Sequence, residues 1–211
     1  MPLSDEQRQH LADIQQAAWE VNQSVAAILA AEVVPVPSAV WAFPVGTEKY
    51  PPEKWYCAQY HNPVGANGHT GIDLNLDVSP WGDVDRGMPV CAVASGVVYV
   101  TGYSTSYLGS IIIQSEHNSA PLYVRCWHLA DDAQFRLWKV GDRVFAGECL
   151  GHIGNYVLGE GGDHCHLDMR NQSFEPHWWF TSHPGGWLDP VPILEAHLDP
   201  PIVKAMLAKK K

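Results

Sequence analysis

Residues 161–169 read GGDHCHLDM, a glycine pair followed by two histidines with one residue between them. Alternate side chains of a β-strand point to opposite faces, so His164 and His166 share one face if this stretch is extended. Two imidazoles then converge on one point, and imidazole is the side chain that binds metals most often. A His-x-His pair also occurs on solvated strands, so a metal site needs further ligands from elsewhere in the chain.

The same β-type signal continues through residues 38–192. Short runs rich in β-branched and aromatic residues alternate there with Gly, Pro, Asn and Asp. Examples are PVCAVASGVVYVTGY (89–103), SIIIQSE (110–116), LYVRCWHLA (122–130) and DRVFAGECLGHIG (142–154). We therefore predict a mainly β domain over residues 38–192, built on antiparallel sheet.

Two segments flank this domain. Residues 4–31 are predicted to form one helix, because Ser4 and Gln7 match a capping box and no Gly or Pro interrupts the run. An apolar stripe with helical spacing comprises Leu11, Ile14, Ala18, Val21, Val25 and Ile28. The stripe fits packing on its own domain or a short coiled coil, so we expect a monomer or a weak homodimer. Residues 1–37 are thus assigned to an amphipathic helix with a Pro-rich linker, and residues 193–211 to a C-terminal tail.

Composition and charge exclude some functions. The chain of 211 residues is 46% hydrophobic and 17% charged, which is typical of a folded globule. Its formal net charge of −10 argues against nucleic acid as a partner, because such binding needs clustered Lys and Arg. The basic run KKK at 209–211 is too short to form such a patch.

The sequence shows no pattern typical of a targeting segment or of paired cysteines. The start MPLSDEQRQH has no positively charged region, and the apolar run VAAILAA (25–31) is far shorter than the ~20 residues that span a bilayer. We therefore expect no signal peptide and no membrane span. Free, buried thiols are predicted for all the cysteines, because none has C-x-x-C spacing: Cys57, Cys91, Cys126, Cys149 and Cys165.

A second candidate ligand pair lies upstream of the histidine pair. In GHTGIDLNL (68–76), His69 and Asp73 are four residues apart. Together with one histidine of the later pair, they would make a zinc site with three protein ligands. A fourth position left open for water or substrate is typical of catalytic zinc rather than structural zinc.

These motifs carry a family resemblance. HTGIDL (69–74) and HCHLD (164–168), with GMPVCAVASGVV (87–98) and KVGDRVFAGECLGHIG (139–154) between them, resemble the lysostaphin-type (LytM-type) zinc metallopeptidases. The resemblance covers residues 42–192. It implies a small β-sheet fold with a narrow groove, and cleavage of peptide bonds in bacterial peptidoglycan.

The resemblance also implies a role for each motif residue. It assigns the zinc ligands to His69, Asp73 and His166, and it places His128 and His164 beside the metal as acid, base or transition-state stabilisers. The chain departs from the family pattern in two places. Trp127 precedes the histidine of the Y-x-H-L-type motif, and HLDM replaces the usual aromatic-acid ending, but neither change removes a metal-binding atom.

The sequence therefore predicts a zinc-dependent endopeptidase that hydrolyses peptidoglycan stems or cross-bridges. Without a secretion signal, we expect a phage-type lysis enzyme, made in the cytoplasm and acting on the wall after release or from a virion. One alternative is a non-catalytic wall-binding activator of another hydrolase. A second is a D-Ala-D-Ala carboxypeptidase, although that site uses a longer His-to-Asp spacing. The scissile bond stays open, because groove loops determine it.

The remaining polar residues are interpreted as structural. Glu160 and Asp163 lie beside the histidine pair and are interpreted as solvated residues of a Gly-rich turn. Four histidines have no motif partner: His61, His117, His152 and His197.

Overall fold

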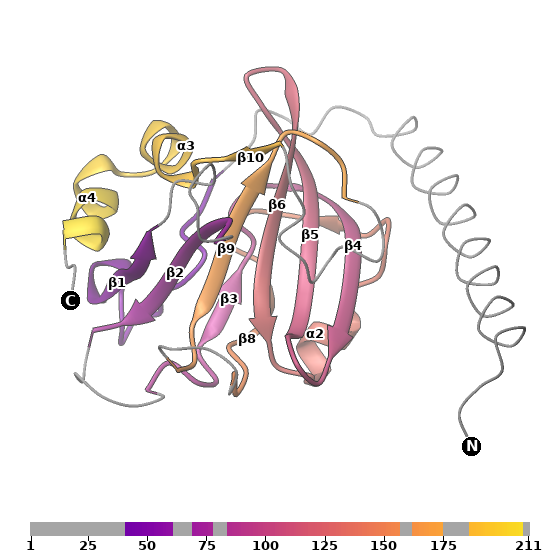
Figure 1. Cartoon of the computed structure of the whole chain (residues 1–211), viewed down its shortest axis with the longest axis horizontal. Helices are drawn as coiled ribbons and strands as arrows, with labels where there is room; N and C mark the ends of the chain where they lie inside the picture. Colours follow the sequence, from indigo (N-terminus) through magenta and orange to yellow (C-terminus); the bar gives the residue numbers. More distant parts are fainter. Residues whose placement is uncertain (1–40, 61–68, 78–83, 157–161, 175–185, 209–211) are drawn as a thin grey trace, which may run out of the picture. The chain divides into compact units, whose positions relative to one another are not determined.

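The computed structural model describes residues 41–60, 69–77, 84–156, 162–174 and 186–208 (Figure 1). All of them belong to a compact unit that spans Val36–Lys211. The helix predicted over residues 4–31, and the homodimer contact assigned to it, lie outside the described residues.

The described chain is dominated by one antiparallel sheet of eight strands. Its path runs β1 (Trp55–Tyr60), β2 (Gly71–Leu76), β9 (Cys165–Arg170), β6 (Ala120–Leu129), β5 (Leu108–His117), β4 (Gly96–Ser104) and β7 (Arg143–Val144), and β10 (Trp187–Leu188) also pairs with β9. The prediction of a mainly antiparallel β fold is confirmed. Strands β2 and β6 flank β9, so motifs far apart in the sequence lie side by side (Figure 1).

A second, two-stranded sheet pairs β3 (Pro89–Cys91) with β8 (Cys149–His152). Val90 and Leu150 of this small sheet are fully buried in the same hydrophobic core as the large sheet. The large sheet contributes to that core mainly Ile72, Leu74, Ile111, Ile113, Val124, Cys126, Cys165, Leu167 and Met169. The core therefore joins strands from both sheets.

Helices are short and peripheral. They are η1 (Pro52–Lys54), α2 (Ala133–Leu137), α3 (Pro190–His197) and α4 (Pro200–Ala208). Helix α4 lies beside β1 and packs on α3 (Figure 1), and Ile193, Leu194, Val203 and Met206 bury their side chains in the core. The segment that the sequence analysis set apart as a tail thus contributes to the domain interior.

Strand β9 is buried along its whole length. Its residues Cys165, Leu167 and Met169 belong to the hydrophobic core, and the alternation places His166 and Asp168 on the opposite face. Since those two are also buried, the second face of the strand is covered by other side chains, through polar and aromatic contacts, instead of solvent. These contacts make up the candidate site.

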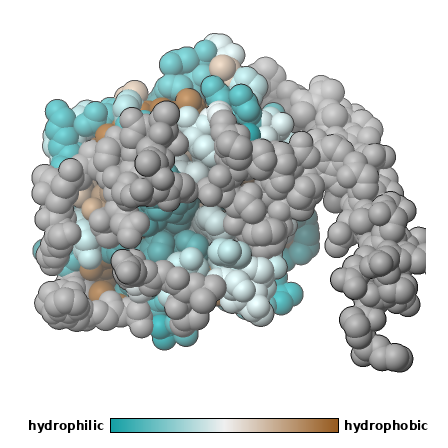
Figure 2. All heavy atoms as spheres, in the orientation of Figure 1, coloured by the Kyte–Doolittle hydropathy of each residue, from teal (hydrophilic) through white to brown (hydrophobic). Residues whose placement is uncertain are grey.

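Figure 2 shows the surface character of the described atoms that are visible on one face. The described atoms visible there are mostly hydrophilic or neutral, with small scattered hydrophobic spots. Among the described residues, no helix is long and apolar enough to cross a membrane. All five cysteines are free thiols, as predicted; Cys57, Cys126 and Cys165 are buried, whereas Cys91 and Cys149 are half-buried.

Candidate metal centre

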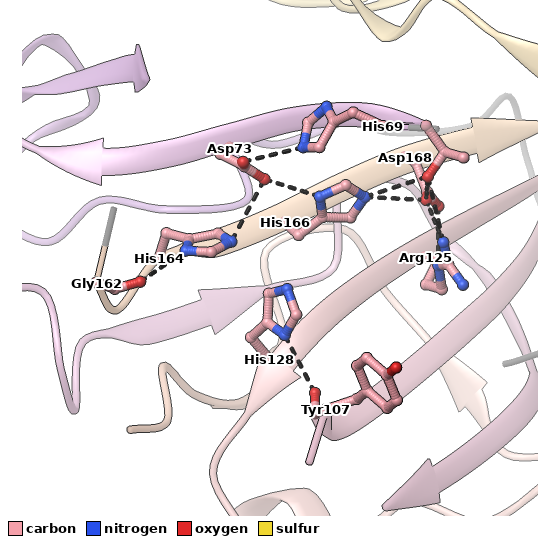
Figure 3. Close-up of polar contacts among 10 residues, drawn as sticks. His69, Asp73, Tyr107, Arg125, His128, Gly162, His164, His166 and Asp168 are labelled. Carbon is pink, nitrogen blue, oxygen red and sulfur yellow. Dashed lines mark hydrogen bonds and ion pairs between the residues drawn. The ribbon is translucent and has the colours of Figure 1, made fainter. Parts of the chain in front are cut away.

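Strand pairing brings the two motifs together. Asp73 on β2 lies directly opposite His166 on β9, and His69 stands just before the start of β2. The Nε2 of His69 is 2.9 Å from Oδ2 of Asp73, and the Nδ1 of His166 is 2.7 Å from Oδ1 of the same carboxylate (Figure 3). The carboxylate of Asp73 is therefore in hydrogen-bond contact with both imidazoles. The three side chains predicted as zinc ligands lie in direct contact.

The donor set fits a zinc ion. The candidate ligand atoms of His69, Asp73 and His166 all lie within 4.8 Å of one another. Two imidazole nitrogens and one carboxylate oxygen match a frequent ligand set of catalytic zinc. A second group with the same spacing comprises His128, His164 and His166. The assignment of ligands within this cluster stays a prediction.

Charge in the cluster favours a cation. Burial alone raises the pKa of Asp73, but hydrogen bonds from His166 and His69 outweigh burial and hold this pKa well below its usual range. Burial lowers the pKa of His166, yet its hydrogen bonds to Asp168 and Asp73 raise that pKa to about 9. In this structure both ring nitrogens of His166 donate to carboxylates, so the ring carries a positive charge. A proton thus occupies a position that a metal ion would compete for.

His164 reaches the same carboxylate from the other side. Its Nδ1 is 2.9 Å from the carbonyl oxygen of Gly162, and its Nε2 is 3.4 Å from Oδ1 of Asp73 (Figure 3). A carbonyl only accepts, so Nδ1 is the donor and Nε2 holds the lone pair of the neutral ring. Burial lowers the pKa of His164, which favours that neutral form. Its Nε2 is then a proton acceptor facing the cluster.

His128 is held in a similar state at the end of β6. Its Nδ1 donates to the carbonyl of Tyr107 at 3.1 Å (Figure 3), which leaves Nε2 as the acceptor. Burial, together with electrostatic interactions with His164 and His166, keeps the pKa of His128 well below its ordinary value. The His128 ring stacks on Tyr156 at 3.9 Å between centroids and meets His164 edge-on at 4.7 Å.

An unusual backbone angle brings His128 to this position. Its φ is +66°, in the left-handed region that few non-glycine residues adopt. In a regular strand, His128 and its neighbour Trp127 would point to opposite faces. Instead, their rings stack at 4.9 Å, and each lies within 6.0 Å of the His166 ring. Strain of this kind is concentrated at functional sites.

The interpretation of Asp163 as a solvated turn residue is wrong. Its side chain is fully buried and accepts hydrogen bonds from Nε of Arg86 at 2.5 Å and from the backbone N–H of Tyr156 at 2.6 Å. These bonds tie Arg86, which precedes β3, to Tyr156 and Asp163. Glu160 lies outside the described residues.

Sequence reasoning also missed Arg125, Asp168 and Thr70. Asp168 accepts hydrogen bonds from His166, Arg125 and Thr70. Two signals pointed to them: Asp168 lies two residues after His166, hence on the same strand face, and Arg125 interrupts the otherwise apolar run LYVRCWHLA. Neither signal identified the partner across the sheet.

The unmatched histidines have structural partners. His152 pairs with Asp132 at 2.7 Å, and the Nδ1 of His117 is 2.9 Å from Nε2 of His197. His197 also stacks on Trp41 at 4.1 Å. These contacts agree with a structural role for the three; His61 lies outside the described residues.

Residues 67–176, just over half of the chain, match the family described as Peptidase family M23. This range begins two residues before His69 and includes every predicted site residue. A search of curated proteins found no significant match.

Several solved structures are similar to the chain at low identity. CbpA from L. salivarius REN is 21% identical, with a TM-score of 0.46 over 75% of this chain and 96% of that one. Lysostaphin is 22% identical, with a TM-score of 0.47 over 73% of this chain and 55% of that one. In the complex of SpoIIIAH and SpoIIQ, the matching chain is 18% identical, with a TM-score of 0.49 over 72% and 99% of the two chains. The chain thus spans only about half the length of lysostaphin.

Proposed function

Because the chain belongs to peptidase family M23, we propose that it is a zinc-dependent endopeptidase that hydrolyses peptide bonds in the stems or cross-bridges of bacterial peptidoglycan. The family match confirms the resemblance to lysostaphin-type peptidases. The observation that carries the proposal is the contact of Asp73 with both His69 and His166, beside two imidazoles whose Nε2 atoms are acceptors.

Each residue has a distinct part in this proposal. His69, Asp73 and His166 would hold zinc, which when bound polarises a carbonyl and lowers the pKa of water. The neutral rings of His128 and His164 would accept a proton at Nε2 and return it to the leaving amine. Once protonated, either ring also offers a donor to the developing oxyanion.

The surroundings of His128 suit this role. The carbonyl of Tyr107 fixes the Nδ1–H, and the stacked rings of Tyr156 and Trp127 restrict the tilt of the imidazole. Burial keeps the pKa of His128 low, so the ring is neutral near neutral pH and its Nε2 carries a lone pair. His164 is oriented in the same way by Gly162. Two bases are therefore pre-oriented on one side of the Asp73 carboxylate.

Digestion of purified cell walls tests the proposal. Walls of several bacterial types would be incubated with the zinc-loaded chain, and the products identified by mass spectrometry. We expect new free amines, no new reducing sugar ends, and glycan chains that keep partial stems. His69→Ala protein, treated in parallel with the same zinc, is the matched control.

Other product patterns would contradict the proposal in defined ways. Release of intact stems from bare glycan would make the chain an amidase. Release of terminal D-alanine alone would make it a carboxypeptidase. Binding to walls of every type without any cleavage would favour the non-catalytic activator. Delivery after phage lysis or from a virion stays part of the sequence-based prediction.

A further inference from the structure

A buried ion pair lies next to the candidate metal centre. Arg125 on β6 is directly opposite Asp168 on β9, and both side chains are 0% exposed. The Nε of Arg125 donates to Oδ1 of Asp168 at 3.1 Å, and one terminal nitrogen donates to Oδ2 at 2.5 Å. This two-point contact holds the plane of the carboxylate (Figure 3).

Stability alone is a poor reason to keep this pair. Taking two charges out of water costs free energy, and well-packed hydrophobic residues of similar volume often serve a core equally well. The main hydrophobic core lies on the opposite face of the sheet, where Val124 of β6 and Leu167 of β9 are buried. The contacts of the ion pair instead indicate its role.

Asp168 touches His166 on the side away from Asp73. The Nε2–H of His166 donates to Oδ2 of Asp168 at 3.0 Å, while its Nδ1 faces Asp73 at 2.7 Å. A histidine that donates one ring N–H to a carboxylate has its other nitrogen free for a metal, in a fixed orientation. Asp168 thus determines which nitrogen of His166 faces the candidate metal position.

Further contacts fix the carboxylate itself. The hydroxyl of Thr70 donates to Oδ2 of Asp168 at 2.6 Å. Gly71 lies opposite Asp168, and a Cβ at position 71 would come within 2.5 Å of the Asp168 Cβ. The guanidinium carbon of Arg125 lies 4.2 Å from the ring centroid of Trp127. This cation–π contact restricts the position of the guanidinium.

We propose that Arg125, Asp168 and Thr70 form a positioning network that holds His166 as an Nε2–H donor and directs its Nδ1 toward the metal. The proposal rests on the proposed function, because it takes the cluster of His166 and Asp73 as a zinc centre. None of the three residues belongs to the candidate ligand groups of the metal centre. They act through His166, so zinc affinity is the quantity that they change.

The test measures zinc binding by the full chain in competition with a chromophoric chelator. Asp168→Asn keeps the shape of the side chain but removes the charge that accepts the Nε2–H. We expect this variant to bind zinc about 10–100-fold more weakly. Asp163→Asn is the matched control, because Asp163 is also buried and paired with an arginine, and its described hydrogen bonds come from Arg86 and the backbone of Tyr156. We expect the control to keep the zinc affinity of the unaltered chain.

A second pair of variants distinguishes lost positioning of His166 from misfolding. Thr70→Val removes the hydroxyl donor without leaving a buried charge unpaired, whereas Thr70→Ser keeps the hydroxyl. We expect weaker zinc binding from the valine variant and affinity close to that of the unaltered chain from the serine variant. Long-range ¹H–¹⁵N spectra of the zinc-loaded chain add a direct readout. The Nε2–H of His166 should exchange slowly with water, and its exchange should accelerate in Asp168→Asn and Thr70→Val.

The outcomes separate this proposal from the proposed function. Unchanged zinc affinity and unchanged Nε2–H exchange in both Asp168→Asn and Thr70→Val would overturn the positioning network and leave the endopeptidase proposal intact. Unaltered chain that binds zinc but cleaves no wall would contradict the endopeptidase proposal. In that case the zinc affinities of the variants would still show whether the network positions His166.

Discussion

Asp73 and His166 face each other across strands β2 and β9, with Oδ1 of the aspartate 2.7 Å from Nδ1 of the histidine. The two residues are 93 positions apart in the sequence. Their contact joins the H-x-x-x-D motif to the H-x-H motif, and His69 completes the cluster from the other oxygen of the same carboxylate.

Removing a predicted ligand should remove both metal and activity. His69→Ala and Asp73→Ala each leave two of three protein donors, and metal affinity falls sharply when a ligand is lost. We expect about one zinc per unaltered chain and none in either variant after dialysis, measured by elemental analysis. An active preparation that contains no transition metal would rule out a zinc centre.

Removing a predicted proton carrier should lower activity but leave the zinc bound. His128→Ala and His164→Ala should keep zinc but lose turnover by roughly 10²-fold or more, the usual contribution of general acid–base groups. Zinc content and initial rates on a soluble wall peptide, measured on the same sample, check this. Loss of zinc from either variant would mean that the group of His128, His164 and His166 holds the ion instead.

The close approach of β2 and β9 depends on a residue without a side chain. A Cβ at Gly71 would lie 2.1 Å from the carbonyl oxygen of Leu167, a backbone atom that cannot move aside. Gly71→Ala should therefore lower the free energy of unfolding by about 1–3 kcal/mol, as overpacking does in other cores. Gly151→Ala on β8 is the control, because its nearest contact, at 3.3 Å, is a side-chain atom of Phe135. Urea denaturation measures the free energy of unfolding of both variants. An equal loss in Gly71→Ala and Gly151→Ala would contradict a special need for glycine at position 71.

The free energy of unfolding should fall in mild acid because of a histidine pair where α3 contacts β5. Partial burial, and then the charge of His117, lower the pKa of His197. The unfolded chain therefore binds a proton at His197 at higher pH than the folded chain does, so the stabilisation present above the unfolded pKa of about 6.5 is lost as pH falls through the folded pKa.

The His197→Gln variant isolates this contribution. Its free energy of unfolding should decline less between pH 7 and pH 5 than that of the unaltered chain, as measured by denaturant titrations at each pH. The stacking partner Trp41 and the neighbour His117 are unchanged in the variant. Parallel curves for the two chains would show that this histidine pair does not contribute to acid sensitivity.

Much of the fold was predictable from local pattern. Alternating β-rich runs specify strands because the period of two is a property of the backbone. The same alternation placed His164 and His166 on one face, and the four-residue spacing identified His69 and Asp73. The meeting of His69 and Asp73 with His166 could be anticipated only because both motifs resemble those of a known family.

The sequence by itself determined the strand-rich domain, the family and the identities of the clustered side chains, since each depends on residues close together in the chain. Tertiary structure alone decided how those side chains are held. The left-handed φ of His128 overrides strand alternation, and the burial of Asp163 requires Arg86, 77 residues away. The pairing of Arg125 with Asp168 requires the register between β6 and β9. Register and burial are set by packing across the whole sheet, so no local pattern encodes them.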